Sequence, residues 1–194
     1  MYTQKVSDQE LIKLYLDGKE SGLVELIKRH KSKIYTSIYF LVKDSDLAED
    51  LFQDTFIKII NSLKSGHYQD EGKFLPWAIR IGHNLVIDYF RVEKRMPKLR
   101  ETEEFSIFER LHIEEDNVQD KMIKKQLHDE LRELLNDLPF EQKEIIIMRH
   151  YADMSFKEIA EATNVSINTA LGRMRYAIIN LRKLIEQKNI IIEL

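Results

Sequence analysis

The sequence contains no cysteine, and only 6 glycines and 3 prolines occur among its 194 residues. Disulfides, thiolate metal sites and cysteine nucleophiles are therefore excluded. Because glycine and proline most often mark tight turns, their scarcity indicates long helices joined by few turns. Long hydrophobic runs are also missing. The strongest, at residues 34–42, is too short to cross a bilayer.

The N-terminal residues become polar and acidic within the first eight positions, where a signal peptide needs an apolar core. Hydrophobic residues make up 43% of the chain, which is enough to build real cores. We therefore expect a cytoplasmic protein that does not insert into a membrane.

Patterns typical of catalysis are missing as well. The six histidines lie 16 or more residues apart, so no two of them are spaced to bind a metal on one helix face. The glycine-bounded segment at residues 66–74 lacks the Ser or Thr with which a phosphate-binding loop holds magnesium. The sequence predicts no metal, no cofactor, no small-molecule substrate and no catalytic residue, so a binding function is favoured over an enzymatic one.

Apolar residues recur at three- and four-residue steps along most of the chain, which is typical of amphipathic helices. No alternating run bounded by turn residues indicates a strand. We expect an all-α protein with two helical domains, residues 1–96 and 120–194, joined by a flexible acidic linker at residues 97–119. The predicted helices lie near residues 7–17, 22–42, 46–63, 76–91, 120–137 and 139–148, followed by a helical pair from residue 155.

The formal net charge of -3 conceals an uneven distribution. Residues 74–100 hold six basic and two acidic residues, a net +4, whereas residues 101–120 hold eight acidic residues and one basic residue, a net -7. Residues 166–185 carry four basic residues and no acidic one. Since a phosphate backbone responds to local potential, the two basic segments are compatible with nucleic-acid binding.

The helical pair near the C-terminus has the pattern of a helix-turn-helix. Ser155 and Glu158 have the spacing of a capping box, Asn164 tolerates a left-handed turn, and Ser166 caps the second helix. In this motif the N-terminal part of the second helix enters the major groove. The alternative is a helical hairpin whose polar face is merely solvated. We expect these residues of the second helix to pack inward: Ile167, Ala170, Met174, Ala177 and Leu181.

Polar residues also form a stripe on the helix predicted at residues 76–91. Arg80, Asn84, Asp88, Arg91 and Arg95 follow one another at steps of three or four. The aromatic residues Tyr68, Phe74 and Trp77 lie in or beside the preceding loop, and aromatics next to positive charge suit unstacked single-stranded bases. The alternatives are a solvated surface with an Asp88–Arg91 pair, and a core position for Trp77.

Several separated motifs resemble extracytoplasmic-function (ECF) sigma factors of bacterial RNA polymerase. The similarity covers about residues 20–96 and 120–186. It is carried by AEDLFQDTF at residues 48–56, FLPWAIRIGHNLVIDYFR at residues 74–91, Leu138-Pro139, and Glu158-Ile-Ala160.

The resemblance implies a promoter-specificity subunit that binds core RNA polymerase at its clamp and flap regions. It also implies promoter DNA and an anti-sigma factor as partners. The implied polymerase-binding residues are Asp50, Gln53 and Asp54, and the loop at residues 65–73 would hold a base flipped from the non-template strand. The implied contacts to the −10 region are Tyr68, Lys73, Trp77, Arg80, Asn84 and Arg91. The implied contacts to the −35 element are Ser166, Asn168, Thr169, Gly172, Arg173, Arg175 and Tyr176.

Two positions depart from the family pattern. Leu171-Gly172 stands where a basic residue followed by Ser or Thr is usual, and Thr163-Asn164 replaces a more usual Leu-Gly. A conventional dimeric helix-turn-helix regulator is the alternative function, and a helical interaction protein without a DNA partner is a third. The acidic linker is either a solvated tether or a segment threaded through polymerase.

Overall fold

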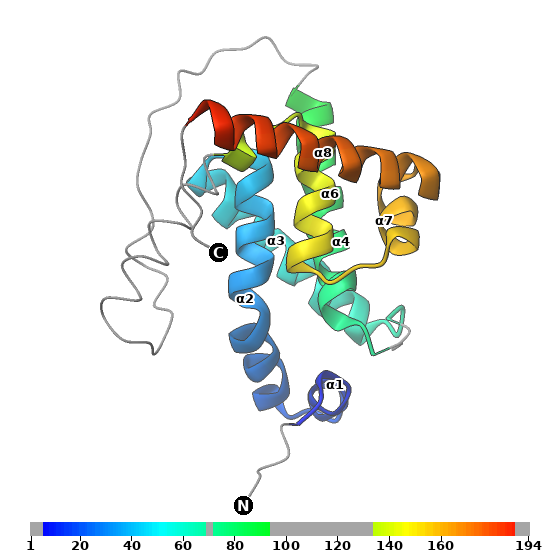
Figure 1. Cartoon of the computed structure of the whole chain (residues 1–194). Coiled ribbons are helices and arrows are strands. Elements are labelled where there is room, and N and C mark those ends of the chain that lie inside the picture. Colours follow the sequence, from blue (N-terminus) through cyan, green and yellow to red (C-terminus); the bar gives the residue numbers. More distant parts are fainter. Residues whose placement is uncertain (1–5, 69–71, 94–133, 189–194) are drawn as a thin grey trace, which may run out of the picture. The chain divides into compact units, whose positions relative to one another are not determined.

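A computed structural model describes residues 6–68, 72–93 and 134–188, and these residues contain helices and no strand. The all-α class expected from the sequence is confirmed for this part of the chain. The chain divides into two compact units, Met1–Glu101 and Thr102–Leu194 (Figure 1). The predicted linker at residues 97–119 and the predicted helix at residues 120–133 lie outside the described residues, as does Arg95.

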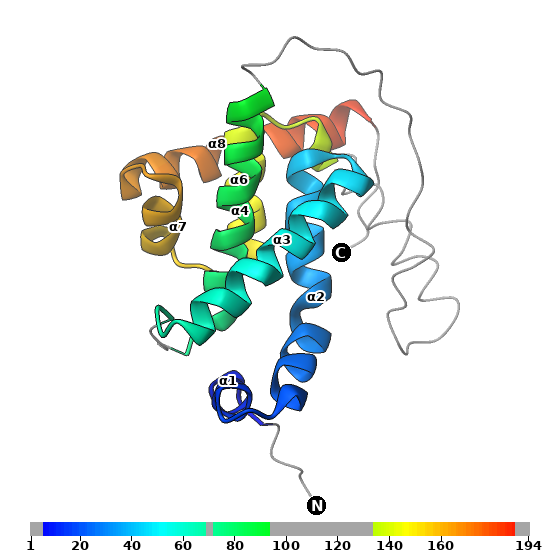
Figure 2. The ribbon, with the colours of Figure 1, turned by 180° about the vertical axis from the view of Figure 1, so that it is seen from behind.

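The first unit is built around one long helix. Helix α2 (Glu20–Val42) packs against α1 (Asp8–Leu16), α3 (Ser45–Lys64) and α4 (Phe74–Glu93), and α3 also packs against α4 (Figure 2). The apolar residues that recur along these helices meet in one core, as their spacing predicts. Its largest fully buried side chains are Leu26, Ile34, Ile38, Phe40, Ile59, Leu63, Phe74 and Ile79.

Two glycines allow helices of this unit to approach one another closely. A Cβ atom at Gly22 of α2 would lie 2.3 Å from the backbone oxygen of Leu11 in α1. At Gly82 of α4, a Cβ atom would lie 3.1 Å from a side-chain carbon of Ile38 and 3.2 Å from the hydroxyl of Thr55. The first contact involves backbone and cannot relax by turning a side chain.

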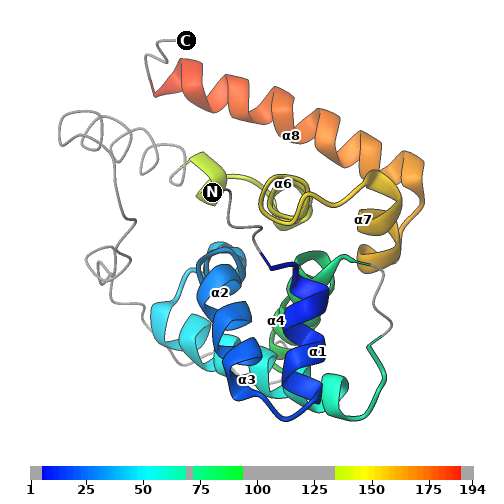
Figure 3. The same ribbon diagram turned by 90° about the horizontal axis from the view of Figure 1, so that it is seen from below.

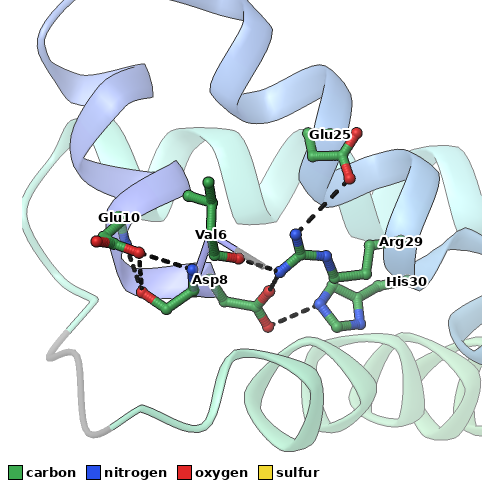
Figure 4. A network of polar contacts seen from close by, with 7 residues as sticks. Val6, Asp8, Glu10, Glu25, Arg29 and His30 are labelled. Carbon is green, nitrogen blue, oxygen red and sulfur yellow. Dashed lines mark hydrogen bonds and ion pairs between the residues drawn. The ribbon is translucent and has the colours of Figure 1, made fainter. Parts of the chain in front are cut away.

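A polar network ties the start of α1 to α2 (Figure 4). Asp8 accepts a hydrogen bond of 2.7 Å from Arg29 through one carboxylate oxygen, and its other oxygen lies 2.7 Å from Nε2 of His30. Arg29 also donates to the carbonyl oxygen of Val6 at 2.9 Å. Burial lowers the pKa of His30 below its usual value, although the neighbouring Asp8 acts in the opposite direction. The ring of His30 packs beside that of Phe74, with centroids 5.3 Å apart.

In the described part of the second unit, three helices pack together. Helix α8 (Ile167–Gln187) packs against α6 (Phe140–Tyr151) and α7 (Phe156–Thr163), and Figure 3 shows α8 running across α6. The core of this unit includes Leu134, Leu135, Leu138, Ile145, Ile147, Met148, Ile159, Ala170 and Ala177.

The helix-turn-helix boundaries predicted from Ser155, Asn164 and Ser166 are confirmed. Ser7 and Ser155 each form a reciprocal capping box, the first with Glu10 and the second with Glu158. Asn164 adopts the left-handed conformation, with φ of 54°, at the end of α7. The Ser and Glu side chains of the two boxes satisfy backbone donors that the first turn of a helix leaves without a partner.

The substitution Gly22→Ala should destabilise the first unit by about 1–3 kcal/mol, because the added methyl group forces α1 away from α2. Hydrogen exchange of the full chain, which follows each unit separately, measures the effect. Gly172→Ala is the matched control, since open space surrounds Gly172 in α8. It should stabilise the second unit by about 0.5–1 kcal/mol. Unchanged protection of α1 and α2 in Gly22→Ala would contradict the close packing.

The stability of the first unit should fall as the pH drops below 6.5, the ordinary value for histidine. The folded state lowers the pKa of His30, so below that pH the unfolded chain binds the proton more readily. Asp8 faces the ring and opposes this effect, whereas Arg29 and Lys33 reinforce it. Urea unfolding at about pH 7.5 and about pH 5.5 should show a smaller pH dependence for His30→Gln than for the wild type. Equal dependence would contradict the assignment.

Candidate nucleic-acid interface

A tight turn sets the direction in which α8 leaves α7. The backbone N–H groups of Asn164 and Val165 both donate to the carbonyl oxygen of Ala160, and the Val165 bond is 3.0 Å long. The next residue, Ser166, begins α8: its Oγ accepts a hydrogen bond of 3.0 Å from the backbone N–H of Thr169. The turn therefore completes the helix-turn-helix that the sequence predicts.

Most of the predicted −35 residues lie on the surface of α8. Ser166, Asn168, Thr169 and Arg175 are exposed, and Tyr176 is 62% exposed. Gly172 is half-buried and has no atom within 4 Å of the point where a Cβ would lie. The hydroxyls of Ser166 and Thr169 lie 2.8 Å apart, so both take part in the cap.

Arg173 has a structural partner that sequence reasoning missed. Its guanidinium lies 3.5 Å from a carboxylate oxygen of Glu144 in α6, and the Glu144 side chain is only 5% exposed. The Arg173 side chain is 27% exposed. A positive partner offsets part of the free energy of burying a carboxylate. In the sequence, Glu144 lies three to four residues from apolar residues of α6. This spacing could have indicated that Glu144 is buried and needs a positive partner.

The prediction that Ile167 packs inward is wrong, because its side chain is 47% exposed. Ala170 and Ala177, both fully buried, form the centre of the face of α8 that packs inward. Each helical residue turns by about 100°, so Ile167 lies about 60° away from Ala170 around the axis. Leu171 and Ile178, each 44% exposed, lie on the same side as Ile167. The inward placement of Ala170 and Ala177 is confirmed, while Met174 and Leu181 are half-buried.

In the first unit, the predicted polar stripe lies on the surface of α4. Arg80, Asn84, Asp88 and Arg91 are exposed. Arg91 donates to the carboxylate of Asp88 at 2.7 Å, so the ion pair considered from the sequence is present. Both side chains are more than half exposed, and such pairs contribute little to stability.

The predicted aromatic residues form a cluster at the start of α4. The ring centroids of Tyr68 and Trp77 are 4.4 Å apart, and those of Phe74 and Trp77 are 5.9 Å apart. Phe74 is buried, whereas Tyr68 and Trp77 are half-buried, and Lys73 is exposed beside them. Residues 69–71 of the predicted base-holding loop lie outside the described residues. In this cluster, the buried ring of Phe74 supports the partly accessible rings of Tyr68 and Trp77.

The three predicted polymerase-binding residues share the exposed face of α3. Asp50, Gln53 and Asp54 lie at steps of three and one and are all exposed, whereas their neighbours Leu51 and Thr55 are buried.

Sequence reasoning missed a fourth residue on this face. Ile57 is 55% exposed and follows Asp54 by three positions. In the sequence, Ile57 does not belong to the apolar stripe that α3 buries, and this could have indicated an exposed apolar residue. We name Asp50, Gln53, Asp54 and Ile57 the α3 face.

The described residues contain neither a candidate metal site nor a membrane-spanning helix. No group of three or more His, Cys, Asp or Glu side chains there is arranged to hold a metal ion. None of the helices described is both long and apolar enough to cross a membrane.

Two family models match the chain in sequence order. The model for Sigma-70 region 2 matches residues 26–96, and a model for Sigma-70 region 4 matches residues 128–171. The first match includes α3, α4 and most of α2. The second includes α6, α7 and the first five residues of α8.

Curated proteins similar to the chain are sigma factors along most of their length. RNA polymerase sigma factor SigV of Bacillus subtilis is 30% identical over 156 residues, which cover 80% of this chain and 86% of SigV. ECF RNA polymerase sigma factor SigW of the same organism is 25% identical over 178 residues, 89% of this chain and 93% of SigW.

Two solved structures share the fold. CnrH, in complex with the cytosolic domain of CnrY, gives a TM-score of 0.64 at 19% identity and covers 94% of this chain and 99% of CnrH. RpoE of Bartonella quintana, in complex with the anti-sigma factor NepR, gives a TM-score of 0.61 at 19% identity, with 84% of this chain and 96% of RpoE covered. The two family models, with SigV and SigW, show that the chain belongs to the ECF sigma factors of bacterial RNA polymerase.

Proposed function

We propose that this sigma factor divides promoter recognition between its two units. Residues 1–96 bind core RNA polymerase and recognise the −10 element as it melts, and residues 120–194 read the −35 element. The chain has no catalytic activity of its own and directs the polymerase to promoters. The observation that carries this division is the order of the two family matches, region 2 before region 4.

The exposed surface of α8 supports the role of the second unit. No acidic residue occurs between Ser166 and Ile185, so no negative charge of the helix faces the phosphates there. Arg175 lies on the exposed surface and is available for a phosphate or a base. The positive potential favours any duplex, whereas contacts to base edges select the sequence.

The aromatic cluster supports the role of the first unit at the −10 element. Tyr68 and Trp77 offer partly exposed rings next to the exposed Lys73. A base that leaves the duplex can stack on such rings while the lysine neutralises its phosphate. Arg80 and Asn84 continue this surface along α4.

The α3 face supports binding to the polymerase. It combines two carboxylates and an amide with the exposed side chain of Ile57. Interfaces commonly place an apolar contact among polar ones, and the apolar contact contributes most when water is excluded from it.

We further propose that an anti-sigma factor covers these surfaces when the factor is inactive. RpoE of Bartonella quintana is bound by the anti-sigma factor NepR in its solved structure, and CnrH is bound by the cytosolic domain of CnrY. Because its polymerase and promoter partners lie in the cytoplasm, the protein acts there.

Run-off transcription tests the proposal as a whole. The full chain is mixed with purified core RNA polymerase on genomic fragments, and transcript starts are mapped. We expect a small promoter set that needs both proteins. Failure to bind core polymerase would refute the proposal, as would tight binding to a palindromic duplex without polymerase, which would favour the dimeric regulator.

Removing the apolar contact of the α3 face should weaken binding to core polymerase. Ile57→Ala is expected to lower the affinity about tenfold, the effect of losing one buried contact of about 1.4 kcal/mol. Val24→Ala is the matched control, because Val24 is 62% exposed on α2 and lies outside the α3 face. Titration with labelled core enzyme measures both variants. Equal affinities would remove Ile57 from the interface.

The two arginines in the middle of α8 should behave differently. Arg175→Ala should weaken promoter binding by the holoenzyme and lower the slope of log affinity against log salt by about one, with little change in stability. Arg173→Ala should instead destabilise the second unit by about 1–3 kcal/mol, since the buried Glu144 loses its guanidinium partner.

Salt-dependent promoter binding and urea unfolding, measured on both variants, separate these effects. Suppose that Arg173→Ala weakened promoter binding but left the stability of the second unit unchanged. Arg173 would then be a DNA contact, and its pairing with Glu144 would contribute little to stability.

A further inference from the structure

The exposed face of α8 carries an apolar stripe that the core does not use. Ile167, Leu171, Arg175 and Ile178 follow one another at steps of four, four and three, so they lie within an arc of about 80°. The three apolar members are 44–47% exposed. We name these four residues the α8 stripe. Its first two members lie in the part of the helix that enters the major groove in this motif.

The polar side chains around the first turn of α8 are largely engaged in structure. The hydroxyls of Ser166 and Thr169 contact each other, and Ser166 also accepts the backbone N–H of Thr169. Arg173 is directed to the buried Glu144 of α6. Asn168 is the remaining exposed polar side chain of the first turn, with Ile167 and Leu171 beside it.

Leu171 is accessible from solution. Its side chain is 44% exposed, and its neighbour Gly172 carries no side chain. A base edge can therefore reach the exposed part of Leu171.

We propose that Leu171, with Ile167 beside it, recognises thymine 5-methyl groups in the −35 element. The methyl group of thymine is the apolar group that the major groove presents, and aliphatic side chains contact it directly. Duplex DNA suits the α8 stripe better than an apolar partner helix, because Arg175 interrupts the stripe and the helix has no acidic residue from Ser166 to Ile185. The proposal rests on the −35 role assigned to the second unit, and it makes Leu171 a specificity-determining residue.

The test removes single methyl groups from the DNA. The probe is a promoter duplex whose −35 element has been selected from a randomised library by the holoenzyme, and each thymine in turn is replaced by deoxyuridine. For wild-type holoenzyme, one or two replacements should lower affinity about fourfold, the effect of one buried methyl or methylene group. The variant Leu171→Ala should lose this discrimination at one of the sensitive thymines at least, because Ile167 remains in place.

Ile178→Ala is the matched control. It removes an equally exposed apolar side chain of the α8 stripe, but about 10 Å further along the helix from the turn. It should keep the wild-type discrimination between thymine and deoxyuridine. Helical circular dichroism of each variant confirms folding, and because Leu171 is exposed, replacing it with alanine should leave the fold intact.

Three outcomes would overturn the proposal: a selected element without thymine, a wild-type holoenzyme indifferent to every replacement, or full discrimination retained by Leu171→Ala. The second outcome would indicate that the α8 stripe meets a protein instead. A scrambled −35 element separates these failures from failure of the proposed function. If scrambling leaves wild-type affinity unchanged, the second unit does not read a −35 element at all.

Discussion

Side-chain capping determines where α1, α3, α7 and α8 begin, because the chain has few glycines and prolines to interrupt its helices. Ser7, Asp44, Ser155 and Ser166 each accept hydrogen bonds from backbone N–H groups of the helix that follows. Each such cap contributes about 1 kcal/mol. The position of the Ser166 cap matters most for function, since a shift by one residue would rotate every side chain of α8 by about 100°.

Capping also uses polar groups that would otherwise be free to bind DNA. Ser166 and Thr169 belong to the residues that the family resemblance assigns to the promoter, yet their hydroxyls hold the first turn of α8 together. Arg173 likewise combines an expected DNA role with the ion pair to Glu144. A side chain engaged within the protein must break or share that contact to bind a base, so its net contribution to recognition is smaller.

The sequence predicted the features that depend on local interactions. The capping box at Ser155 and the left-handed turn at Asn164 follow from residues four or fewer apart. The pairing of Arg173 with Glu144 could not be predicted in this way, because it joins residues far apart in the chain and depends on how α8 packs against α6. The error at Ile167 has a related cause: helical periodicity gives the direction of a side chain but not the width of the buried face.

Small side chains on the buried face explain why large apolar residues are left outside. Ala170 and Ala177 lie at the centre of the packed side of α8, so Ile167 and Leu171, to one side of it, stay partly in water. Ile57 of α3 is exposed in the same way, next to residues expected to meet the polymerase. These exposed side chains contribute little to the stability of the folded state, because apolar side chains stabilise it mainly when they are buried. A partner that covers them supplies this burial at the moment of binding, which makes them sensitive reporters of contact with DNA or polymerase.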